Sequence, residues 1–83
     1  GIDIRAERGA PIRSVDAGVV LFSQWYKGYG NVIFIDHGNH FYSVYAHIDT
    51  FFKQAGDRVE RGEVIATVGN TGSLQGPILY FEI

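Results

Sequence analysis

Hydrophobic and polar residues alternate over short stretches of this chain, and glycine interrupts them at frequent intervals. The clearest case is the segment "NVIFIDHGNHFYSVYAH", which predicts a hairpin with strands 31–36 and 41–47 around a turn at 37–40. No stretch of ten or more residues repeats its hydrophobic positions at helical spacing. The sequence therefore predicts an all-β domain of short strands joined by tight turns.

Shorter patterns predict further strands. The opening "GIDI" is typical of a strand with Asp3 on one face and isoleucines on the other. The segments "IRSVDAG" and "VVLFSQW" indicate two strands separated by Gly18, and residues 63–68 indicate another. The segment "IDTFFKQ" fits either a single helical turn capped by Asp49 or Thr50, or an irregular crossover.

The last strand has one ordinary and one unusual face. Its core face carries Leu79, Phe81 and Ile83. Its other face carries Ile78, Tyr80 and Glu82, a mixture of an aliphatic chain, a phenol and a carboxylate. That mixture is either a binding site, the remains of one, or a solvated surface.

Size and charge narrow the possible functions. A chain of 83 residues forms a single small domain, taken as residues 1–83. Seven basic and nine acidic side chains are mixed along it without a basic stripe, so nucleic acid is not an expected partner. The longest apolar run, 17–22, is too short to span a membrane, and without cysteine there is no disulfide or thiolate metal site. Because the chain begins and ends within strand patterns, we expect a domain of a longer polypeptide.

Taken singly, the candidate catalytic residues indicate little. His37 and His40 fall in the predicted turn, where we expect exposed side chains and no shared metal site. His47 ends a strand whose alternate face also carries Ser43 and Tyr45, and such a lone histidine is more often structural than catalytic. Asp3 alone is typical of an exposed strand carboxylate. No phosphate-binding glycine loop and no serine nucleophile motif is present.

The order of several motifs is more informative than any one residue. The chain contains "GIDI", "GYGNVIFIDHGN", "YAHI", "GDRVERGEVIATVGNTG" and "GPILYFEI" in succession. Together they resemble the LytM/lysostaphin-type zinc endopeptidase domain of peptidoglycan hydrolases, over essentially the whole chain. The resemblance implies a small antiparallel β-sheet structure of the duplicated hybrid-motif type.

Active members of that family bind zinc through a histidine and an aspartate in a His-x-x-x-Asp pair and through the second histidine of a His-x-His strand. By this resemblance Asp3 is the remaining aspartate ligand, and its histidine partner would precede Gly1. His47 matches the catalytic histidine of the Tyr-Ala-His strand. Ile78 stands at the position of the lost base, and Tyr80 at the position of the lost ligand histidine.

Isoleucine cannot bind a metal or transfer a proton, and a neutral tyrosine is a poor zinc ligand. The resemblance therefore implies a degenerate domain without bound cofactor, similar to the EnvC/NlpD-type murein hydrolase activators of cell division. Such a domain would be periplasmic or in the cell envelope, and its partner would be a cell-wall amidase or peptidoglycan. The former substrate groove would bind the partner through Asp3, Tyr26, Tyr29, Tyr45, His47, Ile78 and Tyr80.

Three other functions remain open at the level of sequence. In the first, Tyr80 completes a zinc site and the domain is an active endopeptidase that cleaves peptidoglycan cross-bridges. In the second, the domain binds peptidoglycan passively. The third is a carrier or phosphotransfer domain, but Lys27 and Lys53 are not at hairpin tips of the carrier kind, and no histidine pair suits phosphotransfer.

Overall fold

The computed structural model describes the backbone of residues 2–5, 7–69 and 78–82 and the side chains of residues 7–69. These residues form short strands and no helix, which confirms the predicted all-β class. The strands are β1 (Ile2–Arg5), β2 (Pro11–Arg13), β3 (Gly18–Tyr26), β4 (Gly30–Asp36), β5 (Tyr42–Ala46), β6 (Ile48–Phe51), β7 (Arg58–Val59), β8 (Val64–Val68) and β9 (Ile78–Glu82). None of the described segments is a helix of the kind that crosses a membrane.

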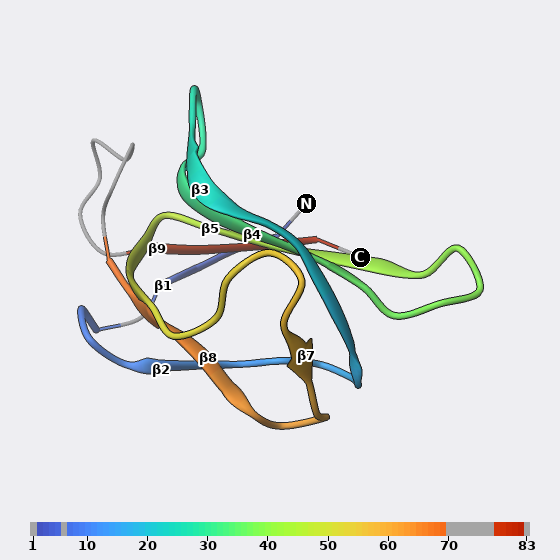
Figure 1. Cartoon of the computed structure of the whole chain (residues 1–83). Helices are drawn as coiled ribbons and strands as arrows, with labels where there is room; N and C mark the ends of the chain where they lie inside the picture. The colour runs from blue at the N-terminus through green and yellow to red at the C-terminus, as the bar shows by residue number, and fades with distance from the viewer. Residues whose placement is uncertain (1, 6, 70–77, 83) are drawn as a thin grey trace.

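The strands form two antiparallel sheets (Figure 1). The larger has the order β1-β9-β5-β4-β3-β7, and the smaller has the order β2-β8-β6. Figure 1 shows β2 and β8 beneath the larger sheet, while the turn between β3 and β4 projects from the opposite side. The antiparallel sheet structure implied by the family resemblance is thus confirmed.

The hydrophobic core lies between the two sheets. The larger sheet contributes Val20, Ile33, Ile35 and Tyr45, and the smaller contributes Ile12, Ile48, Ile65, Ala66 and Val68. Burying one such aliphatic side chain stabilises the fold by about 1.5–3 kcal/mol. In β4 and β5 the core residues alternate with residues of the other face, as the sequence pattern predicted.

The predicted hairpin at 31–47 is confirmed by the pairing of β4 with β5. The His37 amide donates to the Phe41 carbonyl at 2.8 Å, and the Phe41 amide donates to the Gly38 carbonyl at 2.9 Å. The strand that follows the turn is shorter than predicted, since β5 begins at Tyr42 and ends at Ala46.

Two local predictions are wrong. Residues 48–51 form neither a helical turn nor a crossover but strand β6, which pairs with β8 and buries Ile48 completely. Gly18 does not separate strands but is the first residue of β3. It packs closely against the end of β4, where an added Cβ atom would lie 2.4 Å from the Asp36 carbonyl oxygen.

Candidate functional site

Strand β9 lies between β1 and β5 and aligns the candidate positions. Tyr80 is the Cα partner of Asp3 in β1 and of Ala46 in β5. Directly opposed positions in antiparallel strands share a face of the sheet, so these three positions lie on one face. Ile78 is two residues away along β9 and is paired with Arg5. The structure thus brings the positions of Asp3, Ile78 and Tyr80 together.

His47 follows the last residue of β5, Ala46, which is the Cα partner of Tyr80. His47 therefore lies with its backbone next to the position of Tyr80. Its backbone has a positive φ of 60°, which is uncommon for a residue other than glycine. Two loops hold it there: its amide donates to the Tyr29 carbonyl at 3.0 Å, and its carbonyl accepts from the Gly69 amide at 3.0 Å. Strained backbone of this kind is often found at functional sites.

Tyr45 does not belong to this face, so its assignment to the groove is wrong. It is the partner of Ile33, lies in the core, and is only 2% exposed. Its hydroxyl oxygen accepts a hydrogen bond from the Val15 amide at 3.1 Å. The reason is alternation: Ala46 and Val44 occupy the site face of β5, so Tyr45 between them faces the smaller sheet.

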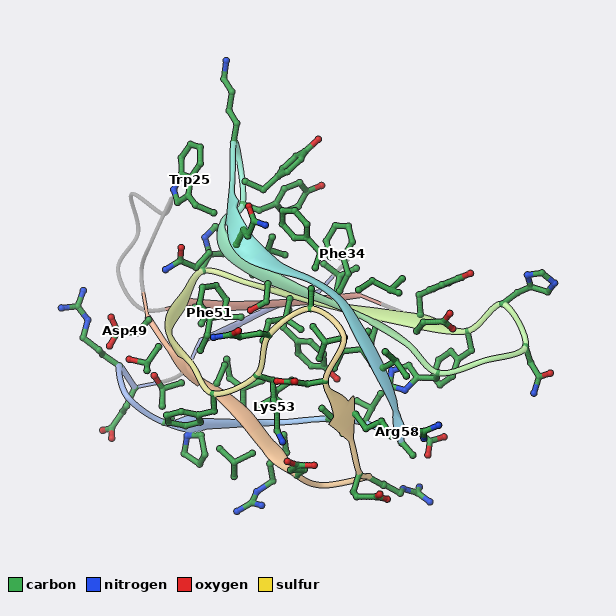
Figure 2. All side chains as sticks on the ribbon, in the orientation of Figure 1. Trp25, Phe34, Asp49, Phe51, Lys53 and Arg58 are labelled. Atoms are coloured by element: carbon green, nitrogen blue, oxygen red, sulfur yellow. The ribbon has the colours of Figure 1, made fainter. Side chains whose placement is uncertain are left out.

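The site face carries a continuous row of aromatic rings, which we call the aromatic row: Phe34, Phe22, Tyr26 and Tyr29. Successive ring centroids are 5.5, 6.2 and 6.0 Å apart along this order. Phe22 and Phe34 are direct partners, and Phe34 is in turn paired with Val44 of β5. Tyr26 and Tyr29 are 52% and 37% exposed, so the outer end of the row is open to a partner. Figure 2 shows Phe34 and Trp25 on opposite sides of the β3–β4 hairpin.

Sequence reasoning proposed Tyr26 and Tyr29 but missed Phe22 and Phe34. The available signal was that Phe34 is a large apolar residue on the face of strand 31–36 opposite Ile33 and Ile35. A strand with apolar residues on both faces is typical of burial on both sides or of a binding surface.

The two histidines of the turn behave differently. His40 is exposed as predicted, whereas His37 is half-buried, which corrects the expectation of an exposed side chain. His37 Nδ1 lies 2.8 Å from the Ala17 carbonyl oxygen, and Nε2 lies 2.6 Å from Ser43 Oγ. A carbonyl can only accept, so Nδ1 carries a proton and connects the start of β3 to the β4–β5 turn. Within residues 7–69, no three histidine, aspartate or glutamate side chains are grouped in a way that could hold a metal.

One ion pair lies away from this face, between Lys53 and Glu63 (Figure 2 labels Lys53). The hydrogen bond from Lys53 lowers the pKa of the Glu63 carboxyl, and the same bond raises the pKa of Lys53. The pair connects the segment after β6 to the turn before β8. Its role is therefore structural.

Comparison with known proteins agrees with this geometry. The model for peptidase family M23 matches residues 1–83. The chain is 44% identical over 82 residues to the DD-carboxypeptidase/endopeptidase Mpg of Neisseria meningitidis, covering 99% of this chain and 19% of Mpg. It is 42% identical to the murein hydrolase activator NlpD of Escherichia coli, covering 100% of this chain and 22% of NlpD. It is 35% identical to the murein hydrolase activator EnvC of Escherichia coli, covering 100% of this chain and 20% of EnvC.

The chain thus spans about a fifth of the length of these curated relatives. Among solved structures, the catalytic domain of the antimicrobial peptidase lysostaphin from Staphylococcus simulans superposes with a TM-score of 0.92 at 28% identity, covering 98% of this chain and 62% of that one. The match covers both sheets, and the family model extends over all 83 residues. The chain belongs to peptidase family M23.

Proposed function

We propose that this chain is a non-catalytic LytM-like domain that regulates peptidoglycan hydrolysis by binding and activating an N-acetylmuramoyl-L-alanine amidase. The observation that carries the proposal is the pair Ile78 and Tyr80 in β9, the strand that lies between β1 and β5. By the family resemblance these are the positions of the lost base and the lost ligand.

The residues at these positions do not fit a catalytic zinc ion. Such an ion needs three protein ligands and an open position for water. Isoleucine has no donor atom, and tyrosine would have to lose a proton whose ordinary pKa is near 10. Asp3 is the one good ligand that the family pattern retains in this sequence. We therefore propose that the domain does not hydrolyse peptides and needs no cofactor.

The aromatic row supports a helical partner. Residues three or four apart on one face of an α-helix are spaced about 5–6 Å. The steps of 5.5, 6.2 and 6.0 Å between ring centroids are similar, so a helix along the row could place one apolar residue on each ring. Tyr26, which is 52% exposed, would contact the polar edge of that helix with its phenol ring.

The relatives include both peptidases and activators, so overall similarity does not choose between them. Ile78 and Tyr80 favour the activator class. We accordingly place the domain in the cell envelope, in the periplasm, where an activator of murein hydrolases would meet its partner.

An amidase activation assay tests the proposal. In the full-length protein, Tyr80→Glu and Ile78→Lys should each abolish stimulation of the host amidase on purified sacculi, while circular dichroism stays unchanged. Tyr42→Glu is a matched control, because Tyr42 is exposed on the same sheet but four residues before Ala46, about 13 Å along the strand. Full stimulation by both groove variants would contradict the proposal.

Passive binding to peptidoglycan gives a different result in the same system. The protein would then sediment with sacculi in the absence of any amidase, and adding the amidase would not increase its retention. That outcome would replace amidase activation with simple peptidoglycan binding as the function.

A further inference from the structure

Strand β3 is paired on its outer side for only part of its length. Strand β7 pairs with Gly18 and Val19, and Val20 still exchanges hydrogen bonds with Gly56 and Asp57. From Ser23 onward no described strand lies on that side of β3. Within the described part of the chain, residues 23–25 are therefore a sheet edge that no strand pairs on its outer side.

The hydrogen-bond pattern of β4 shows which backbone groups face this edge. The His37 amide bonds the Phe41 carbonyl, so His37 and every second residue before it direct their backbone groups to β5. The other β4 residues, among them Val32, direct their backbone N–H and C=O groups to β3. The β3 partner of Val32 is Gln24, so the backbone groups of Gln24 face β4.

Ser23 and Trp25, on either side of Gln24, consequently point their N–H and C=O groups away from β4. In the described part of the chain no backbone group bonds the N–H or C=O of either residue on the outer side, although the Ser23 hydroxyl donates to the Lys53 carbonyl at 2.8 Å. Ser23 and Trp25 are two residues apart, so their outward N–H and C=O groups are about 6.8 Å apart along the strand. An extended peptide repeats its backbone groups at the same spacing on each side.

A pocket of about 390 Å³ lies directly beside this edge. Its lining is Ser23, Gln24, Phe51, Phe52, Gln54 and Ala55. None of these side chains is charged, and residues 21–26 carry no charge either. Sheet edges are usually protected by charged residues or proline, and this one has neither. Trp25 and Phe52 beside it are 61% and 54% exposed.

We infer that the β3 edge at Ser23–Trp25 is a strand-addition site for a short, uncharged, extended segment of a partner polypeptide. The segment would complete the ladder with the free backbone groups of Ser23 and Trp25, and one of its alternate side chains would enter the pocket against Phe51 and Phe52. The surface is separate from the aromatic row, because Trp25 and Phe34 lie on opposite sides of the hairpin (Figure 2). The inference is independent of the proposed amidase partner.

Titration of the full-length protein with the blocked peptide acetyl-Thr-Val-Thr-Val-Thr-amide, followed by hydrogen-exchange mass spectrometry, tests this site. The peptide should slow exchange in residues 21–26. Trp25→Pro removes an N–H that β4 does not use, so the β3–β4 ladder should persist while the peptide binds about threefold to tenfold more weakly. Trp25→Val keeps the N–H and is the matched control, which should retain the protection.

Equal affinity for Trp25→Pro, or protection elsewhere than 21–26, would overturn the inference. Loss of binding in Trp25→Val as well would assign the contact to the indole ring and would also overturn it. If Trp25→Pro disturbs exchange in β4 and β5, the wild-type protein with a probe N-methylated at alternate amides replaces it. That probe should fail to protect 21–26, and protection by it would refute strand addition.

Discussion

Asp3 and Tyr80 are Cα partners across the β1–β9 ladder, and Tyr80 is also paired with Ala46 of β5. In the proposed assignment, this register places the aspartate ligand position opposite the position of the ligand histidine. In the proposed assignment the position of the site is retained in the sheet, while its set of donor atoms is not.

Restoring the imidazoles should restore metal binding. In the full-length protein, the double variant Ile78→His/Tyr80→His should retain close to one zinc ion per chain through gel filtration. The reason is that residues two apart on a strand share a face, so both imidazoles could bind one ion. Tyr80→Phe is the control and should retain none. A double variant that stays free of zinc would show that the sheet positions do not form the family site.

The aromatic row should carry part of the partner affinity. Tyr26→Ala should weaken amidase binding about fivefold to thirtyfold, the range of an interface aromatic that contributes 1–2 kcal/mol. Trp25→Ala removes a neighbouring exposed ring on the other side of the hairpin and should leave amidase affinity unchanged. Surface plasmon resonance with immobilised amidase measures both variants, and equal losses would remove the row from the interface.

Tyr45 should matter for stability. Tyr45→Phe deletes the acceptor of the Val15 amide and should lower the free energy of unfolding by about 1–3 kcal/mol. Tyr42→Phe, on an exposed residue of the same strand, should change it by less than about 0.5 kcal/mol. Urea denaturation compares the two, and a neutral Tyr45→Phe would contradict the core position assigned to this residue.

Gly18 should tolerate no side chain. An added Cβ atom would lie 2.4 Å from the Asp36 carbonyl oxygen and 3.0 Å from His37 Nδ1, so β3 and β4 would have to separate locally. Gly18→Ala should therefore cost about 1–3 kcal/mol of unfolding free energy. The control Ala17→Ser alters an exposed neighbour and should stay within about 0.5 kcal/mol. Equal melting temperatures for the two variants would refute the close packing.

The ion pair predicts a pH dependence with a definite sign. The pKa of Glu63 is lower in the folded protein than its ordinary value of 4.5. The stabilisation that Glu63 gives to the folded state is therefore complete above pH 4.5, and it is lost as the pH falls through the pKa of the folded state. The pKa of Lys53 is raised above 10.5, so its contribution is lost only as the pH rises beyond that value. A double-mutant cycle of Lys53→Met and Glu63→Gln should show coupling at neutral pH that disappears on acidification. Coupling that persists after Glu63 is protonated would contradict the assignment.

The sequence was sufficient to predict the hairpin, because its strands alternate around a short turn. In β4 the buried Ile33 and Ile35 alternate with the half-buried Phe34 and Asp36, although Val32 is also buried. The segment 48–51 could not be predicted, because only Ile48 is fully buried and the pairing with β8 shifts register between Ile48 and Thr50. A strand held by pairing with distant residues carries little local signal.

The candidate site was predictable from motif order rather than from alternation. A regular strand would place Val20 and Phe22 on the same face, but the register shift between them puts Val20 in the core and Phe22 opposite Phe34 on the site face. Such a bulge is not visible in the residue pattern. This is why Phe22 was missed. Tyr45 was assigned to the wrong face for another reason: β5 ends at Ala46 and His47 has a positive φ of 60°, so Tyr45 and His47 do not alternate as in a regular strand.

Zinc content of the full-length protein, purified without chelator and measured by mass spectrometry, tests the non-catalytic assignment most directly. With Ile78 and Tyr80 in β9, we expect far less than one zinc ion per chain, and no hydrolysis of peptidoglycan by the protein alone. A ratio of about one, together with cleavage of cross-linked peptidoglycan, would contradict the assignment and identify the domain as an active endopeptidase.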